Sequence, residues 1–242
     1  MIEIKNLYKK FGKVEVLKGL DLTINPNTSE GGIFAVLGPN GSGKTTLIKS
    51  ILGMVIPNKG DIEIQGKSVL KKHQYRNNIN YLPQIANFPS NLSVNELIKM
   101  VKNLRPKPAA DQEFIDLLRL EPFLDKKLGN LSGGTKQKVN ILLTFMFDSE
   151  LIILDEPTTG LDPISLLNLK KIIVAEKEKG KLILITSHIM SFVEEMADEI
   201  VFLLDGKIYF KGTLAAIKEQ TKQNDLEHAI AAILTHNNST LK

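Results

Sequence analysis

Short apolar or β-branched runs recur along the chain and have the length of strands in a sheet. They lie at residues 2–7, 14–22, 33–37, 61–64, 79–82, 151–154, 182–186, 200–204 and 207–210. Several of them are almost wholly apolar, which is typical of strands that are buried on both faces. Segments of helical length separate the later runs, so we expect a mostly parallel sheet with helices on its faces, an α/β fold. The first runs follow one another without helices, which predicts an antiparallel layer at one edge.

The middle of the chain has a helical pattern instead. Ser93 and Glu96 form a capping-box sequence that opens a helix extending to about Lys102. A second helical pattern runs from about Asp111 to Leu120, and Pro122 is expected to end it. We therefore predict three parts, listed here by their residues: a core at 1–87 and 148–212, a mostly helical subdomain inserted at 88–147, and a short helical tail at 213–242.

The composition is that of an ordinary globular protein and excludes several other classes. Of the 242 residues, 43% are hydrophobic and 24% are charged, which excludes a disordered or collagen-like chain. The absence of cysteine excludes disulfides, zinc ribbons, iron–sulfur centres and a thiol nucleophile. No apolar run approaches about 18 residues, and the charged start does not resemble a secretory signal, so we expect no membrane-spanning segment.

The charge balance narrows the partners only slightly. A net charge of +4 is compatible with phosphate ligands, nucleic acid or an anionic membrane surface. Only three of the 31 basic residues are arginine: Arg76, Arg105 and Arg119. Because the planar fork of arginine is favoured for reading bases, we expect no nucleic-acid partner.

A phosphate-binding loop follows the apolar run at 33–37. The sequence is Gly38-Pro39-Asn40-Gly41-Ser42-Gly43-Lys44-Thr45, and Thr46 continues it into an amphipathic segment. A strand before this pattern and a helix after it are the context that the pattern requires, because backbone amides at a helix start then surround the phosphates. Lys44 is expected to reach the β- and γ-phosphates, and the Thr45 hydroxyl to coordinate Mg²⁺.

A second string resembles a guanine-reading motif. Asn58-Lys59-Gly60-Asp61 spells the N-K-x-D sequence of GTPases, where it lies at the end of a later strand. Here it comes directly after the helix of the phosphate loop, where Asn-Lys-Gly is typical of a turn. We therefore interpret the string as a turn and the nucleotide as ATP.

Two acids end the apolar run at 151–154. Asp155 is suited to Mg²⁺, and Glu156 is suited to activating the attacking water. Adjacent acids at the end of a strand can also be plain surface capping. Their position downstream of a phosphate loop favours the hydrolytic interpretation, because ligands bind at the carboxyl ends of the strands in open α/β sheets.

Two further polar residues follow predicted strands. His188 comes after the run at 182–186, where it can hydrogen bond a γ-phosphate or hold the Glu156 side chain. Gln84 comes after the run at 79–82, where it can contact Mg²⁺ or water. A lone histidine at a helix start is more often a cap or a solvated residue, so neither residue decides the function by itself.

The sequence Leu131-Ser132-Gly133-Gly134-Thr135-Lys136-Gln137 introduces a family resemblance. Ser-Gly-Gly at a helix start is an N-cap with exposed amides that can bind an anion. Ahead of the strand that carries Asp155 and Glu156, it resembles the signature motif of ATP-binding cassette (ABC) ATPases. Six motifs then follow the order found in that family, listed here: the phosphate loop, Gln84, 131–134, 155–156, 160–162 and His188. The resemblance extends from Met1 to about Leu234.

This resemblance implies an Mg²⁺-dependent ATPase that works as a pair. Two copies associate head to tail around two ATP molecules, and the phosphate loop of one copy faces Ser132, Gly133 and Gly134 of the other. Asp162 lies at the dimer contact, and Gln84 links the nucleotide to whatever docks on the helical subdomain. Phe11 matches the aromatic residue that stacks on adenine, with Tyr8 as the less favoured candidate.

The chain departs from the family pattern in two places. Thr135 stands where glutamine is more usual, but the backbone contacts of the signature motif do not depend on that side chain, so we expect activity to survive. The loop Asn25–Gly31 is a few residues longer than usual, and the sequence offers no physical account of it.

Four roles remain open for a single cassette. They are the ATPase subunit of a membrane transporter, a soluble ATPase of translation or DNA maintenance, a non-catalytic nucleotide sensor or scaffold, and the iron–sulfur cluster assembly ATPase. The retained catalytic residues disfavour the scaffold, and the lack of a second cassette, coiled coil or zinc module disfavours the soluble maintenance enzymes. A short tail with Asp225-Leu226-Glu227 resembles exporters whose ATPase is a separate polypeptide, and the run Leu131–Val139 resembles Nos-type ATPases linked to copper-enzyme maturation. We expect an integral membrane permease subunit as partner and a location on the cytoplasmic face of the cell membrane.

Overall fold

The computed structural model describes residues 1–26, 30–105 and 107–239, with side chains described as far as Thr235. Part of the loop Asn25–Gly31, whose length the sequence leaves unexplained, lies outside the described residues. Among the described residues, no helix is both long and apolar enough to cross a membrane.

A six-stranded sheet forms the centre of the molecule. Its order is β10-β9-β3-β8-β7-β6, with bounds β10 Lys207–Thr213, β9 Glu199–Leu204, β3 Gly32–Leu37, β8 Leu182–Thr186, β7 Leu151–Asp155 and β6 Ile79–Leu82. All neighbours are parallel except β9 and β10. Every residue of β3, β7 and β8 is buried, which explains their unbroken apolar sequences. The predicted parallel sheet is confirmed.

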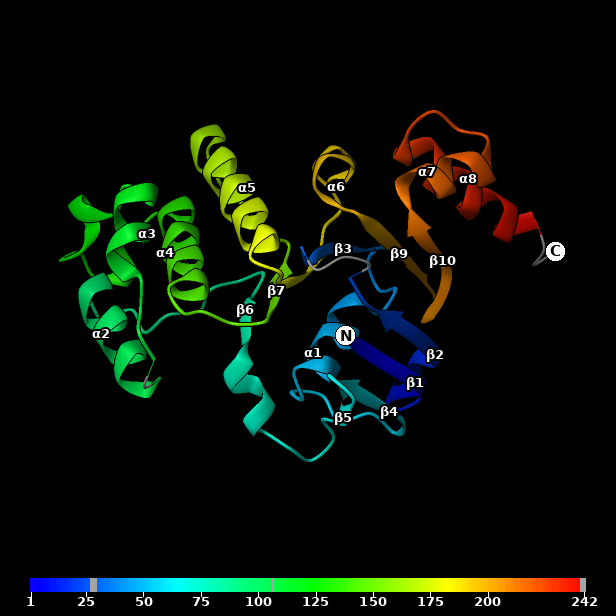
Figure 1. Cartoon of the computed structure of the whole chain (residues 1–242), viewed down its shortest axis with the longest axis horizontal. Coiled ribbons are helices and arrows are strands. Elements are labelled where there is room, and N and C mark those ends of the chain that lie inside the picture. Colours follow the sequence, from blue (N-terminus) through cyan, green and yellow to red (C-terminus); the bar gives the residue numbers. More distant parts are fainter. Residues whose placement is uncertain (27–29, 106, 240–242) are drawn as a thin grey trace.

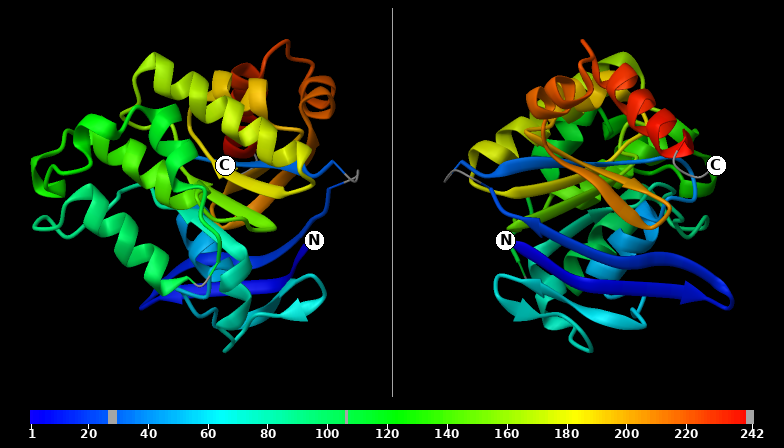
Figure 2. Two further views of the ribbon diagram at one scale, coloured as in Figure 1. Left: turned by 60° about the vertical axis from the view of Figure 1, so that its left-hand side comes forward. Right: turned by 90° about the vertical axis from the view of Figure 1, so that its right-hand side faces the viewer.

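An antiparallel sheet covers one face of the central sheet. It has the order β2-β1-β4-β5, with bounds β1 Ile2–Phe11, β2 Val14–Ile24, β4 Lys59–Ile64 and β5 Lys67–Ser68. Helix α1 (Lys44–Ile51) lies between the two sheets, and its Leu47 and Ile48 are fully buried in a core shared by both. Figure 2 shows this sheet and α1 on one side of the central strands. The predicted antiparallel layer is therefore confirmed, but it is a separate sheet on a face of the central sheet and not at its edge.

The string at 58–61 is not the turn that its sequence predicts. Lys59 and Gly60 already belong to β4, and Asn58 accepts a hydrogen bond from the backbone of Lys10 at 2.8 Å. Gly60 has a φ of +94°, and a Cβ there would lie 2.4 Å from the Asn6 carbonyl oxygen. The prediction failed because pairing with a distant strand, which local sequence does not encode, decides the conformation.

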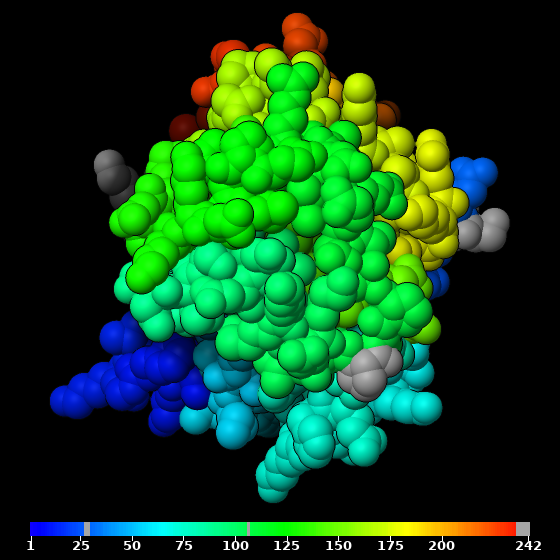
Figure 3. Space-filling view, turned by 90° about the vertical axis from the view of Figure 1, so that its left-hand side faces the viewer, coloured from blue at the N-terminus to red at the C-terminus, as the bar shows by residue number. Residues whose placement is uncertain are grey.

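The segment between β6 and β7 is helical. Its elements are α2 Val94–Leu104, α3 Asp111–Leu118, η2 Glu121–Phe123, η3 Leu128–Asn130 and α4 Gly133–Phe145, and η1 Gln74–Asn78 precedes β6. The capping box forms as predicted: Ser93 Oγ accepts from the Glu96 amide, and Glu96 Oε2 accepts from the Ser93 amide. Figure 3 shows these helices covering one end of the molecule.

Pro122 does not end α3, contrary to the prediction. The helix stops at Leu118, because Arg119 takes a left-handed conformation with φ +54° and donates its amide to the Asp116 carbonyl at 3.1 Å. Pro122 lies in the following turn of 3-10 helix. A left-handed C-cap at a residue other than glycine or asparagine has no clear sequence signal.

The remaining helices cover the other face of the central sheet and one of its edges. They are α5 Pro163–Glu178, α6 Met190–Met196, α7 Leu214–Thr221 and α8 Leu226–Ser239. The core between α4, α5, α6 and the sheet contains Ile152, Leu169 and Phe192. In Figure 1, α7 and α8 lie beside β9 and β10, at the opposite side of the molecule from α2–α4.

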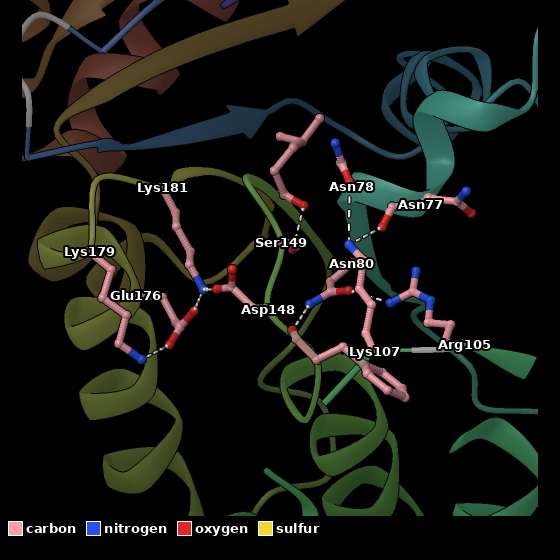
Figure 4. Close-up of polar contacts among 12 residues, drawn as sticks. Asn77, Asn78, Asn80, Arg105, Lys107, Asp148, Ser149, Glu176, Lys179 and Lys181 are labelled. Carbon is pink, nitrogen blue, oxygen red and sulfur yellow. Dashed lines mark hydrogen bonds and ion pairs between the residues drawn. The ribbon is translucent and has the colours of Figure 1, made fainter. Parts of the chain in front are cut away.

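Polar contacts join the end of α2 and the segment after α4 to β6 (Figure 4). Arg105 donates to Asn80 Oδ1 at 2.7 Å and to the Ile79 carbonyl at 2.9 Å, and Asn80 Nδ2 donates to the Phe147 carbonyl at 2.7 Å. Asn80 is buried on β6, and both its side-chain nitrogen and its side-chain oxygen have a hydrogen-bond partner. The point where the helices leave the sheet is therefore tied directly to the point where they return.

Candidate nucleotide site

The loop from Gly38 to Gly43 has the geometry of a phosphate cradle. Gly38 is held tightly, because a Cβ there would lie 2.0 Å from the Leu203 carbonyl oxygen. Gly41 has a φ of +82° and open space around the position of a Cβ. The hydroxyl of Ser42 is buried and has no hydrogen-bond partner among the described residues. A buried hydroxyl of this kind requires an acceptor, and a phosphate oxygen fits this requirement.

Lys44 points back over this loop at the start of α1. Its Nζ donates to the carbonyls of Gly38 at 2.7 Å and Pro39 at 3.1 Å. Burial lowers the pKa of Lys44, and the carboxylates of Glu156 and Asp155 oppose this effect. The ammonium group is thus held among acceptors that a triphosphate can replace.

The two acids at the end of β7 are held by different partners. Asp155 Oδ1 accepts from Thr186 Oγ1 at 2.5 Å, whereas Glu156 Oε2 lies 2.7 Å from His188 Nδ1. Both carboxylates are buried. Glu156 has a φ of +50°, which turns its backbone out of the strand direction. The two adjacent carboxylates therefore point to different places and have different hydrogen-bond partners, as two different chemical roles require.

Two neighbours of Asp155 were not predicted from the sequence. Thr186 ends β8 and donates to Asp155, and its carbonyl also accepts from the Glu156 amide at 3.1 Å. Tyr81 lies on β6; burial raises the pKa of the Tyr81 phenol to about 12, and the nearby Asp155 charge adds to that shift. A hydroxyl at the carboxyl end of a strand beside a predicted acid is the only signal that could have indicated Thr186.

One cavity brings most of the predicted residues together. It has a volume of about 440 Å³ and is lined by Asn40, Gly41, Gly43, Lys44, Thr45, Thr46, Gln84, Asp155 and Glu156, with Val14 and Val16 of β2 at one side. A second cavity of about 440 Å³ shares Asn40, Gln84 and Glu156 with it and adds Gly38, Pro39 and His188. The structure thus unites the ends of four strands and the phosphate loop. A larger cavity, of about 680 Å³, lies elsewhere and is lined by none of the predicted residues.

Phe11 lies at the end of β1, close to β2. Its side chain is exposed, and Lys9 Nζ lies 4.8 Å from the ring centroid. Tyr8 packs against Gly19, where a Cβ would lie 2.6 Å from its hydroxyl. Of the two aromatic candidates, Phe11 is the more exposed, at 50% against 36% for Tyr8.

The signature residues lie apart from these cavities. Ser132 caps α4 by accepting from the Thr135 amide at 3.2 Å, and Ser132 and Gly133 are exposed. A Cβ on Gly134 would lie 2.7 Å from the Gly160 carbonyl oxygen, so Gly134 touches the segment that leads to Asp162. The described residues that line the two cavities do not include Ser132, Gly133 or Gly134.

Asp162 closes the segment that follows Glu156. It caps α5 by accepting from the Ser165 amide at 2.9 Å, and it pairs with Lys138 of α4 at 3.0 Å. Hydrogen bonds from Ser165, first from its backbone and then from its hydroxyl, lower the pKa of Asp162, and Lys138 adds to the effect. Asp162 therefore joins the start of α5 to α4.

The sheet and the phosphate loop define a P-loop nucleotide-binding fold, and comparison with known proteins narrows it. A family model described as ABC transporter matches residues 17–159. A lantibiotic transport ATP-binding protein of Streptococcus pyogenes is 35% identical, over 86% of this chain and 89% of the relative. A Nod factor export ATP-binding protein of Burkholderia lata is 31% identical, over 90% of this chain and 72% of the relative.

Solved structures of ABC transporter components have the same fold. One described as the ATP-binding subunit of an ABC transporter has a TM-score of 0.88 and 29% identity, and covers 97% of this chain and 99% of its own. One described as the dimeric structure of a bacterial ABC transporter cassette has a TM-score of 0.78 and 25% identity, covering 88% and 99%. The chain belongs to the ABC transporter family, as its ATP-binding and ATP-hydrolysing component.

Proposed function

We propose that this ATPase powers export through a separate integral membrane subunit, from the cytoplasmic face of the membrane. The observation that carries the proposal is the cavity where Lys44, Thr45, Gln84, Asp155 and Glu156 meet. A phosphate loop, metal-binding oxygens and a buried carboxylate in one cavity are the parts that hydrolysis of a bound nucleotide requires.

Each residue has a role in this proposal. The loop Gly38–Thr46 and Lys44 bind the triphosphate, and Phe11 stacks on adenine. Thr45, Gln84 and Asp155, which line one cavity, would hold Mg²⁺, and the ion would neutralise phosphate charge. No group of three or more His, Asp or Glu side chains in the described part of the chain could hold a metal ion. A site with one carboxylate fits Mg²⁺, which is usually completed by water and substrate phosphates.

Glu156 is the proposed general base, and His188 positions it. The Glu156 carboxylate lies in the same cavity as Lys44 and Thr45, so it can accept a proton from a water beside the γ-phosphate. The contact of 2.7 Å between His188 Nδ1 and Glu156 Oε2 fixes the direction of that carboxylate. His188 itself is exposed and can also reach a phosphate oxygen.

A second copy of the chain completes the site in this proposal. Ser132, Gly133 and Gly134 lie at an exposed helix start, where amides and the helix dipole favour a phosphate. Their separation from the cavity of their own chain supports a head-to-tail pair, with Asp162 at the contact. The dimeric cassette structure with a TM-score of 0.78 supports pairing within the same fold.

The names of the relatives favour transport over the alternative role in iron–sulfur cluster assembly, and one of them names export. We propose that the core, 1–87 and 148–212, binds the nucleotide, that the helices within 88–147 receive the membrane subunit, and that the tail is 213–242. The Nos-type resemblance stays a prediction.

The test is recovery of partners with the Glu156→Gln variant. Tagged protein is isolated from detergent-solubilised membranes of the cells that make it, with ATP and Mg²⁺ present. The expected partner is a polytopic membrane protein, absent when the same membranes are treated without the tagged protein. Recovery of soluble partners alone would contradict the transporter proposal and favour the cluster-assembly role.

A further inference from the structure

Two buried amide side chains on α4 join the ends of β6 and β7. Gln137 Nε2 donates to the carbonyl of Pro157 at 3.0 Å, and Asn140 Nδ2 donates to the carbonyl of Pro83 at 3.0 Å. Asn140 Nδ2 also lies 3.4 Å from Gln137 Oε1, which links the two amides. A continuous chain of hydrogen bonds thus runs from one strand end, across the helix, to the next.

The two carbonyls occupy special positions. Pro157 directly follows Glu156, and Pro83 directly precedes Gln84. Both acceptors therefore lie one peptide from a residue of the nucleotide cavity. The donors lie on the helix that Ser132 caps, so a movement of the signature residues moves both amides with it.

Burial of these amides calls for an explanation. Gln137 and Asn140 are only 5% and 4% exposed, and their neighbours on α4, such as Val139 and Ile141, are apolar. An unpaired buried amide is unfavourable, and an apolar side chain of the same shape can fill such a position at little or no loss of stability. What the two amides add is a fixed position of α4 relative to the backbone at the ends of β6 and β7.

We propose that Gln137 and Asn140 are positioning residues for ATP hydrolysis. They set the Gln84 and Glu156 backbones relative to the signature helix and do not touch the nucleotide. The inference rests on the proposed roles of Gln84 and Glu156. It assigns the coupling between the helical segment and the hydrolytic carboxylate to Gln137, which ends the signature sequence at 131–137 and has no role from the resemblance, and to Asn140, which lies outside the quoted motifs.

Thr144 provides a matched control on the same helix. It is 4% exposed, one turn after Asn140, and its hydroxyl donates at 2.8 Å to the Asn140 carbonyl, within α4 itself. Its contact with the Tyr81 carbonyl is long, at 3.5 Å. Thr144→Val therefore removes a buried polar group from α4 and leaves both strand-end contacts in place.

The experiment measures steady-state ATP hydrolysis by three purified variants, Gln137→Met, Asn140→Leu and Thr144→Val. Each new side chain is close in shape to the native one. We expect kcat to fall by about tenfold or more in the first two, with the KM for ATP within about twofold of native. Thr144→Val is expected to keep the native kcat. Titration with ATP gives the fraction of folded protein, and Asn140→Ala replaces Asn140→Leu if the latter does not fold.

A double variant tests the route of the effect. If Asn140 acts through Gln84, Gln84→Ala combined with Asn140→Leu loses no more activity than Gln84→Ala alone, because coupled residues are not additive. Multiplicative losses, a native kcat in Asn140→Leu, or an equal loss in Thr144→Val would overturn the inference. Full activity of Glu156→Gln would instead contradict the proposed function, so the two failures are distinguishable.

Discussion

Glu156 shows how one residue can depart from the strand that carries it. Its φ of +50° places a non-glycine residue in the left-handed region, which costs about 1–2 kcal/mol. The bond from its amide to the Thr186 carbonyl and the His188 contact hold it there. The conformation turns the carboxylate away from the partner of Asp155, so the strain has a direct consequence for the chemistry.

The Glu156→Gln substitution tests the proposed base. Glutamine keeps the shape of the side chain but cannot accept the proton of the attacking water, so kcat is expected to fall by about 10²-fold or more. ATP affinity is expected to persist, because Lys44 and the phosphate loop remain. Phosphate release and ATP binding are measured on the same preparation. Hydrolysis at the native rate would show that Glu156 is not the base.

The Lys44→Ala substitution tests the phosphate site. Lys44 supplies charge-assisted hydrogen bonds, each worth about 1.5–3 kcal/mol, so ATP binding should weaken by at least about tenfold. Lys49→Ala on the exposed face of α1 is the control, because it removes the same charge from the same helix. Calorimetric titration with ATP measures both variants. Equal affinities in the two would place the triphosphate elsewhere.

At the scale of elements, the sequence predicts most of the fold. Unbroken apolar runs predict the fully buried strands, such as β7 and β8, and the capping box predicts the start of α2. The failures have two causes. Pairing of β4 with β1 converts a turn sequence at Lys59 into strand, and this contact with a distant segment is not contained in a local pattern. A left-handed Arg119 ends α3 before Pro122 through local hydrogen bonds, and a left-handed residue other than glycine or asparagine has no clear sequence signal.

The candidate site divides in the same way. Lys44, Thr45, Gln84, Asp155 and Glu156 follow from motifs at strand ends, because parallel strands bring their carboxyl ends to one edge. Thr186, Tyr81, Gln137 and Asn140 belong to no such motif. Their relation to the site depends on the packing of α4 and on the order of strands β6, β7 and β8, which the sequence alone does not give.

The capping box of α2 gives a prediction for one element. Ser93→Ala removes the acceptor for the Glu96 amide, so the free energy of unfolding should fall by about 1 kcal/mol. Ser90→Ala at an exposed position before α2 is the control and is expected to leave stability unchanged. Urea denaturation monitored by circular dichroism compares them. Equal stabilities would show that α2 does not depend on its cap.

A buried ion pair gives a second prediction at this scale (Figure 4). Lys181, which directly precedes β8, contacts Glu176 of α5, and both side chains are less than 10% exposed. The exposed Asp148 lies 2.6 Å from Lys181. Glu176→Ala leaves the buried ammonium with one solvated partner and should destabilise the fold by about 3 kcal/mol. Glu176→Leu combined with Lys181→Met is expected to recover most of that loss. Urea unfolding measures the stability of both variants. A double variant with a lower free energy of unfolding than Glu176→Ala would contradict this account.

At the scale of the whole molecule, the catalytic parts and the signature residues face different places. Lys44 and Glu156 share a cavity, whereas Ser132 and Gly133 are exposed at the start of α4. Lys138 and Asp162 join α4 to α5, and Gln137 and Asn140 join α4 to the strand ends. Ser132 and Gly133, which we call the signature surface, are therefore connected through α4 to the cavity of their own chain but do not line it.

This arrangement predicts that dimerisation and nucleotide binding can be separated. Ser132→Arg places a bulky cation on the signature surface and should prevent the ATP-dependent dimer of Glu156→Gln protein. Because Ser132 does not line the cavity of its own chain, the affinity of the monomer for ATP is expected to remain native. Gln220→Arg on α7, at the opposite side of the molecule in Figure 1, is the control for the added charge. Light scattering after size exclusion, with ATP and Mg²⁺, distinguishes monomer from dimer. An unimpaired dimer in Ser132→Arg would exclude head-to-tail association, and a parallel loss of ATP binding would mean that the signature residues serve their own nucleotide.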